Sequence, residues 1–405
     1  MKKLLITLRH PGPCTNIFAV MDRLTKVFKV TLVLSDHAIQ CAEKEMQNME
    51  GVTVYCPVRE MGKLKFVERN RASDFPRTEF EDNEISQYAE LYQAMYSLTE
   101  KIDPDIVLRT TPVFLWGIDE LMPVIMKRLN MSERLRCYQE CYCAGKALSD
   151  GENEVASVGC GNMAVLDEMA AANSTVPNTV AIGYLNARQF QEHRFADRRR
   201  VSRKQLALNE RDKAFLYVAS CIYDIAEELY HFEVFLKQMT GLGDRVKLYL
   251  KFHPRHSETD RNKYAEAIDK SECSVTIIDQ VEYLDLLAFP DCMVSLASSV
   301  NIDAVNYRSF YYEEAQKTFP FISIYPYGPR TASVLRKIYG TENYPSYDKE
   351  GYHLVVSEEA YINEVEQVIR EDEVLRGYEE RYKKNHKNFV DSADRLIEYL
   401  NNACY

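Results

Sequence analysis

Two basic side chains follow a short apolar segment in the second half of the chain, in the run LYLKFHPRH (248–256). The apolar alternation ends at Phe252, and Pro254 prevents further pairing in a sheet because it has no backbone N–H to donate. His253 and Arg255 are therefore predicted at the tip of a strand. An imidazole and a guanidinium there can donate charge-assisted hydrogen bonds to a phosphate. The same residues also suit an ordinary loop and turn.

A pair of serines follows a later strand candidate, in the run SLASSVNIDA (295–304). The strand is expected to end near Leu296, so that Ser298 or Ser299 can cap a helix that continues through Ile302. Small residues and the free N–H groups of a first helical turn together form an anion site. An ordinary serine cap explains the same residues.

Strand and helix signals alternate along the first half of the chain, beginning with a strand at 3–8. A polar, basic segment at 186–206 interrupts this pattern, and a strand at 214–219 starts it again. Strands that alternate with helices pair in parallel through right-handed crossovers, and ligands then bind beyond their carboxyl ends. The two polar segments above are placed at such ends. From 357 to 400 we expect helix almost throughout.

The order of these segments resembles the C-terminal domain of GT-B glycosyltransferases. The resemblance is to the branch with a His-Pro motif and a later Ser-Ser motif, which includes bacterial sialyl- and polysialyltransferases, capsule Kdo transferases and CDP-glycerol glycerophosphotransferases. The segment LALNERDKAFLYVASCIYD (206–224) looks like the first strand and loop of that domain, and FVDSADRLIEYL (389–400) looks like its final helix. Phe252 departs from the pattern, because the family commonly has lysine or arginine before its His-Pro motif.

This resemblance implies an α/β GT-B fold, with two Rossmann-like domains, a cleft between them and a C-terminal helical tail that packs back toward the N-terminal domain. The implied domains are an acceptor domain at 1–190, a nucleotide-donor domain at 205–360, and helices at 361–405 that cross back.

The resemblance also implies roles for residues of the donor domain. His253 would contact the donor phosphate together with Arg255. Ser298 and Ser299 would bind the same phosphates from the other side, and Ser220 would line the site from the first strand.

The catalytic base is expected in the first domain. The sialyltransferase branch carries an acidic-acidic-Gly motif, and the nearest match is Ser149-Asp150-Gly151, in which Asp150 would be the base. Asp-Gly is also a common turn pair. His10, in the loop RHPGP, is a second candidate, and His37 and Glu140 complete the shortlist.

Together, the residues and the resemblance predict a glycosyltransferase. It would move a sugar from a CMP-, CDP- or UDP-linked donor to a hydroxyl of a glycan or lipid-linked acceptor, in bacterial surface-glycan synthesis. We expect no metal and no cofactor, because no Asp-x-Asp motif lies in a suitable loop. Three alternatives stay open: transfer of a polyol phosphate, as by CDP-glycerol enzymes; a non-hydrolysing UDP-sugar 2-epimerase; and a nucleotide-sugar binding protein without catalysis.

Composition limits the possible partners and compartments. The 405 residues include 61 acidic and 50 basic ones, a net charge of -11 that argues against nucleic-acid binding. No stretch approaches the roughly 20 apolar residues that span a bilayer. The eleven cysteines are scattered, which fits a reducing cytoplasm, and the cluster Cys137, Cys141 and Cys143 lacks the second close pair typical of zinc sites. We therefore expect a cytoplasmic protein. The basic linker that contains Arg198–Arg200 could meet anionic lipid at the inner face of the membrane, although an ordinary solvated linker explains the same residues better.

Overall fold

In the computed structural model the chain divides into two compact units. The first contains residues 1–69, 74–188 and 388–405, and the second contains 70–73 and 189–387. The structure describes residues 1–8, 11–35, 38–39, 51–57, 82–110, 118–139, 158–160, 179–191, 193–220, 225–240, 242, 246–253, 256–296, 298–315, 322–339, 354–357 and 391–402.

A parallel sheet forms the centre of the first unit. Its strands follow the order β3-β2-β1-β4-β5-β6-β7 among the described residues, and each neighbouring pair is parallel. This order, reversing direction beside β1, is that of a Rossmann-like sheet. The strands are β1 (Lys2–Leu8), β2 (Phe28–Leu34), β3 (Thr53–Tyr55), β4 (Ile106–Thr110), β5 (Leu135–Gln139), β6 (Val158–Cys160) and β7 (Thr179–Ala181).

Helices cover both faces of this sheet because its strands are apolar on both sides. Leu4, Ile6 and Leu8 of β1 point to one face, where α1 (Pro11–Phe18) and α2 (Met21–Val27) contribute to the core. Leu5 points to the other face and packs with apolar residues of α5 (Asp82–Ile102) and α6 (Ile118–Arg128).

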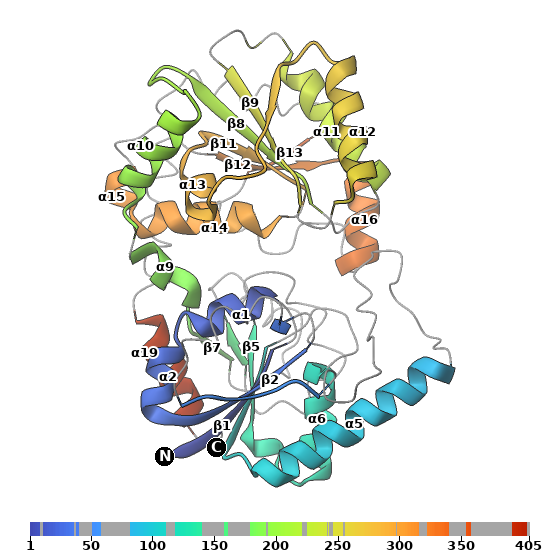
Figure 1. Cartoon of the computed structure of the whole chain (residues 1–405), viewed down its shortest axis with the longest axis vertical. Helices are drawn as coiled ribbons and strands as arrows, with labels where there is room; N and C mark the ends of the chain where they lie inside the picture. Colours follow the sequence, from blue (N-terminus) through green and yellow to red (C-terminus); the bar gives the residue numbers. More distant parts are fainter. Residues whose placement is uncertain are drawn as a thin grey trace. The chain divides into compact units, whose positions relative to one another are not determined.

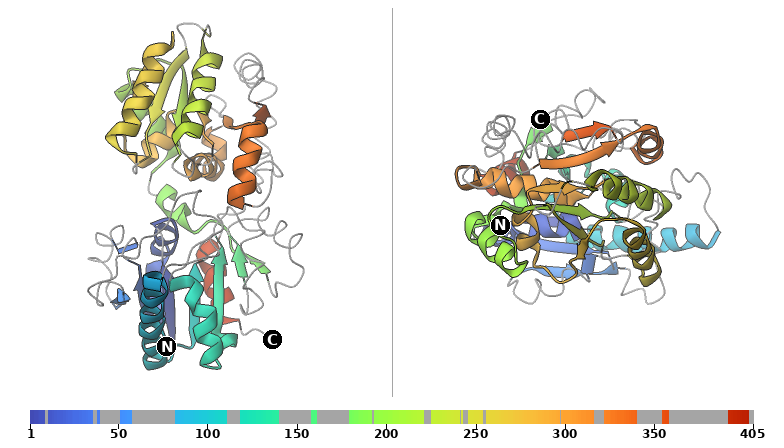
Figure 2. Two further views of the ribbon diagram at one scale, coloured as in Figure 1. Left: turned by 90° about the vertical axis from the view of Figure 1, so that its right-hand side faces the viewer. Right: turned by 90° about the horizontal axis from the view of Figure 1, so that it is seen from above.

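The last described helix, α19 (Ser392–Asn401), belongs to the first unit (Figure 1 and Figure 2). Its Leu396 and Leu400 are buried in the same core as α1 and α2. The hydroxyl of Tyr399 donates to the carbonyl of Cys137 in β5 at 3.0 Å. The expected packing of a C-terminal helix on the N-terminal domain is confirmed.

The second unit contains its own parallel sheet, in the order β10-β9-β8-β11-β12-β13 among the described residues (Figure 1). It is a second Rossmann-like sheet, in which the order reverses beside β8. The strands are β8 (Lys213–Val218), β9 (Val246–Lys251), β10 (Val275–Ile277), β11 (Cys292–Val294), β12 (Ile322–Tyr327) and β13 (Leu354–Ser357).

The helices of the second unit pack on the two faces of this sheet. Phe215 and Tyr217 of β8 point to one face and form a core with α11 (Ile225–Met239) and α12 (Glu258–Lys270). Among its described residues, the unit also contains most of α9 (Arg188–Gln191), together with α10 (Phe195–Gln205), α13 (Tyr283–Ala288), α14 (Ser299–Phe310), α15 (Tyr312–Ala315) and α16 (Pro329–Tyr339).

Helix α10 occupies the segment interpreted above as a basic linker. Arg199 is 5% exposed and donates to the carbonyl oxygens of Ala288 at 2.9 Å and Phe289 at 2.8 Å. It also pairs with Asp291 at 2.5 Å, and Arg203 pairs with the same carboxylate at 3.0 Å. Arg199 is therefore not available to anionic lipid, and that part of the membrane expectation is wrong. Its charge stabilises the second unit instead.

Removing the Asp291 carboxylate tests this ion cluster. Asp291→Ala should lower the free energy of unfolding by about 3–5 kcal/mol, because two buried guanidinium groups lose their counter-charge. Urea unfolding followed by circular dichroism measures the change. Asp394→Ala is the matched control, since it removes an ion pair with Arg23 in which both side chains are about half exposed. It should cost under about 1 kcal/mol, and equal losses in the two variants would refute the role given to Asp291.

Candidate functional site

Three loops leave neighbouring strand ends in the second unit. β8 lies between β9 and β11 and pairs with both in parallel (Figure 1). Ser220 follows β8, His253 follows β9 and Ser298 follows β11, each within a few residues. Because parallel strands end at the same edge, these three residues belong to one edge of the sheet. Helices α11, α12 and α14 begin just beyond them. Acidic residues stand in the first turns of α11 and α12, whereas the first turn of α14 has none, so that its N-terminal partial charge favours an anion there.

Ser298 caps α14. Its backbone is extended, its Oγ accepts a hydrogen bond from the Val300 N–H at 3.3 Å, and its own N–H donates to Ser295 Oγ at 3.2 Å. The predicted serine cap is thus present, and Ser299 is the first residue of the helix. The side chain of Ser299 lies outside the described residues. A cap of this kind leaves other N–H groups of the first turn available to a ligand oxygen.

His253 begins a turn. The His256 N–H donates to the His253 carbonyl at 3.0 Å, a bond between residues three apart that is typical of a β-turn. His253 is half-buried, and its ring centroid lies 6.1 Å from that of His256. The placement of Pro254 and Arg255 themselves lies outside the described residues. The phosphate contacts predicted for His253 and Arg255 stay predictions.

Ser220 is 2% exposed, and its side chain is bonded inside the unit. Its hydroxyl contacts Oε1 of Glu228 in α11, and its backbone N–H donates to Oε2 of the same carboxyl at 3.3 Å. The predicted position after the first strand of the unit is found, whereas its contact with a donor stays a prediction.

Sequence reasoning missed Glu228. Two acidic residues in the first turn of a helix usually balance the helix dipole from the surface, so Glu227 and Glu228 carry no signal of burial. Glu228 is nevertheless 1% exposed, and burial raises its pKa to about 8 against the opposing effect of its two bonds from Ser220. A carboxyl with this pKa is largely protonated at neutral pH.

His256 was also given no role by the sequence. Its Nε2 lies 3.1 Å from the Ser220 carbonyl oxygen, and since a carbonyl only accepts, Nε2 carries the proton. The ring is 9% exposed, and burial lowers its pKa. The neutral ring leaves Nδ1 as an acceptor, and this atom has no hydrogen-bond partner among the described residues.

The corresponding edge of the first unit carries a different polar cluster. Asp119, fully buried at the start of α6, contacts the Thr7 hydroxyl at the end of β1. The Thr110 hydroxyl at the end of β4 lies 3.4 Å from the same carboxyl group and 3.1 Å from the Thr7 carbonyl oxygen. The cluster holds two strand ends together. The predicted bases Asp150 and His10, and the shortlisted His37 and Glu140, lie outside the described residues.

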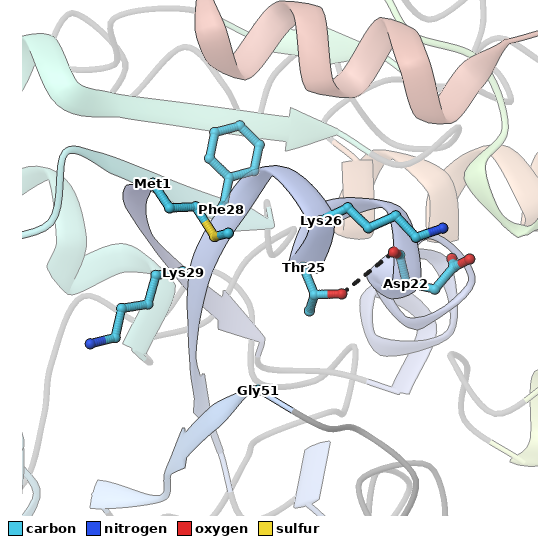
Figure 3. A pocket seen from close by; sticks show the side chains of 7 residues that line it. All are labelled: Met1, Asp22, Thr25, Lys26, Phe28, Lys29 and Gly51. Carbon is cyan, nitrogen blue, oxygen red and sulfur yellow. Dashed lines mark hydrogen bonds between the residues drawn. The ribbon is translucent and has the colours of Figure 1, made fainter.

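A surface pocket lies at the opposite edge of the first sheet, beside the amino ends of its strands (Figure 3). Phe28 opens β2, and Gly51 precedes β3. The pocket lies away from the carboxyl ends of the strands, where a Rossmann-like sheet binds its ligands. It is lined by Met1, Asp22, Thr25, Lys26, Phe28, Lys29 and Gly51.

Two further findings concern metals and membranes. No group of three or more His, Cys, Asp or Glu side chains is arranged to hold a metal ion within the part of the chain that the structure describes. Cys137 is buried, and Cys141 and Cys143 lie outside that part. The expectation of a metal-independent protein is not tested by this. None of the described helices is long and apolar enough to cross a membrane.

Comparison with known proteins shows the fold. No protein-family model and no curated protein matches the chain. Solved structures match almost its whole length. They include the UDP-GlcNAc 2-epimerase from Neisseria meningitidis bound to UDP-GlcNAc, with 11% identity, a TM-score of 0.61 and coverage of 98% of this chain and 99% of that one.

Two other structures have the same relation to the chain. A UDP-forming α,α-trehalose-phosphate synthase from Burkholderia xenovorans has 10% identity, a TM-score of 0.64 and coverage of 100% of both chains. MurG from Acinetobacter baumannii has 10% identity, a TM-score of 0.53 and coverage of 98% of this chain and 99% of that one. The expected GT-B fold with two Rossmann-like domains is confirmed. The narrower resemblance to the His-Pro and Ser-Ser branch stays a prediction.

The raised pKa of Glu228 makes stability depend on pH. Between about pH 4.5 and pH 8 the folded protein keeps a proton that the unfolded chain has lost. The contribution of Glu228 is therefore full below that window and falls by up to about 1.4 kcal/mol per pH unit as pH rises through it. Glu228→Gln cannot ionise, so its free energy of unfolding should gain on the wild type as pH rises.

Urea unfolding of the two proteins across this window measures the difference, in which all other titrating groups cancel. Glu227→Gln is the control, because Glu227 lies next in sequence but forms an ion pair with Arg330 and has a partly exposed side chain. A wild type that runs parallel to Glu228→Gln at every pH would show that Glu228 ionises normally.

Proposed function

We propose that the chain is a GT-B glycosyltransferase that moves a sugar from a nucleotide-activated donor to a hydroxyl acceptor. The observation that carries the proposal is that His253 and the Ser298-capped start of α14 both follow strands that end at one sheet edge. The chain has the fold of a UDP-GlcNAc 2-epimerase whose structure contains UDP-GlcNAc, and of a UDP-forming trehalose-phosphate synthase. A nucleotide diphosphate at this edge explains why basic and N–H donors gather there.

The leaving group of such a transfer is a nucleotide phosphate, whose negative charge grows as the glycosidic bond breaks. Fixed hydrogen-bond donors stabilise this charge best, because they need no reorganisation during the reaction. His253, Arg255 and the first turn of α14 would supply them, with Ser298 and Ser299 on the side opposite His253. No step of this scheme requires a metal ion or a cofactor.

The acceptor hydroxyl loses its proton to a general base, for which Asp150 and His10 are the candidates from the first unit. A carboxylate or an imidazole of ordinary basicity can do this within hydrogen-bond distance of the hydroxyl. The acceptor class that we propose is a glycan or lipid-linked molecule of the bacterial surface, made in the cytoplasm or at the inner face of the membrane.

A 2-epimerase is the second candidate, because a UDP-GlcNAc 2-epimerase with its UDP-GlcNAc bound is among the solved structures that match the chain. An epimerase acts on the nucleotide sugar without an acceptor, whereas a transferase needs one. Incubating the protein with UDP-GlcNAc alone and separating the products distinguishes the two, since a new UDP-sugar would identify an epimerase. Transfer of a polyol phosphate differs from both and would require a CDP-polyol donor.

Nucleotide binding can be tested by thermal shift. A donor that binds only the folded protein adds about 2.7 kcal/mol to the free energy of unfolding at a ligand concentration one hundred times Kd, and the melting temperature rises with it. The panel is CMP, CDP, UDP, GDP and their sugars, and we expect one base to stand out. A flat response to every member would refute the proposal, while binding without transfer or epimerisation would favour a non-catalytic binding protein.

The phosphate site can be tested at one residue. His253→Ala should reduce transfer, or nucleotide affinity, by more than about tenfold, because a donor aimed at the developing charge is lost. Its thermal stability should stay close to that of the wild type, since His253 lies in a turn at the surface of the unit. Lys247→Ala is the matched control, because Lys247 is exposed at the amino end of the same strand. Full activity in His253→Ala would show that the phosphate binds elsewhere.

A further inference from the structure

Every polar group of Ser220 is engaged by a buried side chain. Its N–H and its hydroxyl contact the two oxygens of Glu228, and its carbonyl oxygen accepts from His256 at 3.1 Å. Glu228 lies in α11, whereas His256 closes the turn that follows β9. Ser220 is thus fixed from two elements at once.

This clamp connects the carboxyl ends of two neighbouring strands. Ser220 lies two residues beyond β8, and the His256 N–H donates to the carbonyl of His253, which lies two residues beyond β9. The Ala219 N–H also donates to the Lys251 carbonyl at 3.0 Å, so that the pairing of β8 and β9 continues up to the clamp. A shift at the end of either strand would therefore be transmitted to the other.

Glu228 has the environment of a neutral carboxyl. It is 1% exposed, it forms no ion pair among the described residues, and its hydrogen bonds come from Ser220 alone. Keeping a buried charge without a counter-charge is costly, and a carboxyl in that position keeps its proton instead. Burial accordingly raises the Glu228 pKa to about 8.

The proton on Glu228 has two consequences at the sheet edge. The Ser220 N–H donates to Oε2, so a protonated Oε1 can donate to the Ser220 hydroxyl and leave the hydroxyl proton available to a ligand. An ionised carboxylate can only accept, so the Ser220 hydroxyl would donate its proton to Glu228 and have none to donate to a ligand. The ionised carboxylate would also place an unpaired negative charge, at low dielectric, behind the edge where an anion is to bind.

We propose that Glu228 and His256 are positioning residues of the phosphate site, and that Glu228 acts as a neutral carboxyl. Neither residue is assigned a contact with the reacting atoms. They hold Ser220 and the ends of β8 and β9 in the arrangement that accepts a nucleotide diphosphate. The proposal rests on the proposed function, because it deepens the description of the same site.

The surrounding titratable groups do not compete with Glu228 in the relevant pH range. His256, from the turn after β9, and His231, one helical turn along α11, are both neutral there because burial lowers their pKa values. Arg330 of α16 pairs with Glu227. Glu227 itself is an ion-paired carboxylate on the same helix. A change in ligand affinity near pH 8 that depends on Glu228 therefore reports this carboxyl.

The test measures the affinity of the full chain for UDP and CDP by isothermal titration calorimetry at two pH values. With a pKa of about 8, about one Glu228 in ten keeps its proton at about pH 9, so wild-type affinity should fall about tenfold from about pH 7. Glu228→Gln keeps a neutral amide of the same shape, so it should restore binding at the higher pH. Glu227→Gln should follow the wild type at both.

His256 is tested by rescue. His256→Leu removes the donor to the Ser220 carbonyl and should weaken UDP binding severalfold at both pH values. His256→Gln returns an N–H donor and should recover part of the affinity. If His256 only filled space, His256→Leu would bind UDP at least as well as His256→Gln. Infrared spectroscopy without ligand adds an independent measurement, because the wild type at about pH 7 should show a protonated carboxyl band that Glu228→Gln lacks.

The outcomes separate the two proposals. If the wild type binds UDP or CDP and loses affinity in parallel with Glu228→Gln, or if the carboxyl band is absent, the positioning role is overturned and the proposed function stands. If the wild type binds neither UDP nor CDP at about pH 7, the positioning role is overturned, while the proposed function stands if CMP or GDP binds and falls if they do not. A tenfold loss that Glu228→Gln abolishes and Glu227→Gln retains supports the proposal.

Discussion

Parallel pairing of β8 with β9 and β11 is the constraint on which the candidate site depends. Parallel strands must end at one edge, and the crossover helices must begin there. That arrangement brings Ser220, His253 and Ser298 together although they are far apart in sequence, and it directs the starts of α11, α12 and α14 to the same edge. The anion site proposed at this edge would depend on backbone geometry first and on side chains second.

Buried acids show three ways in which this chain manages a carboxyl inside a core. Asp291 has two guanidinium partners, Arg199 and Arg203. It thereby joins α10 to β11, the strand that begins at Cys292. Asp119 contacts hydroxyl groups at the ends of two strands. Among the described residues Glu228 has only Ser220 as a partner, and burial raises its pKa to about 8. The acid with the fewest partners is the one beside the candidate phosphate site, where protonation can affect binding.

The fold is compatible with several reactions and does not by itself identify the one that this chain catalyses. An epimerase, a trehalose-phosphate synthase and MurG all match the chain over nearly its whole length at 10–11% identity. Unrelated reactions share a fold because the scaffold supplies strand ends and helix starts, while the loops supply the reacting groups. The proposed transfer therefore rests on residues at the sheet edge beyond β8, β9 and β11, and the candidate bases Asp150 and His10 stay predictions.

Local sequence was sufficient to predict β8, β9, the serine cap of α14 and the C-terminal helix. The signals for these elements are apolar runs, Pro254 and Ser298, and each of them determines the structure of residues adjacent in sequence. β12 was not predicted, because Pro326 lies within it and Pro320 and Pro329 stand on either side, and prolines are unfavourable in a central strand. The segment of α10 was interpreted as a linker because its arginines look solvated until Asp291 is brought beside them. The sequence by itself determined the two-domain α/β fold and which residue types stand at the strand ends. Only the tertiary structure decided that Glu228 and His256 meet Ser220, because burial and proton affinity depend on which distant residues exclude water from a side chain.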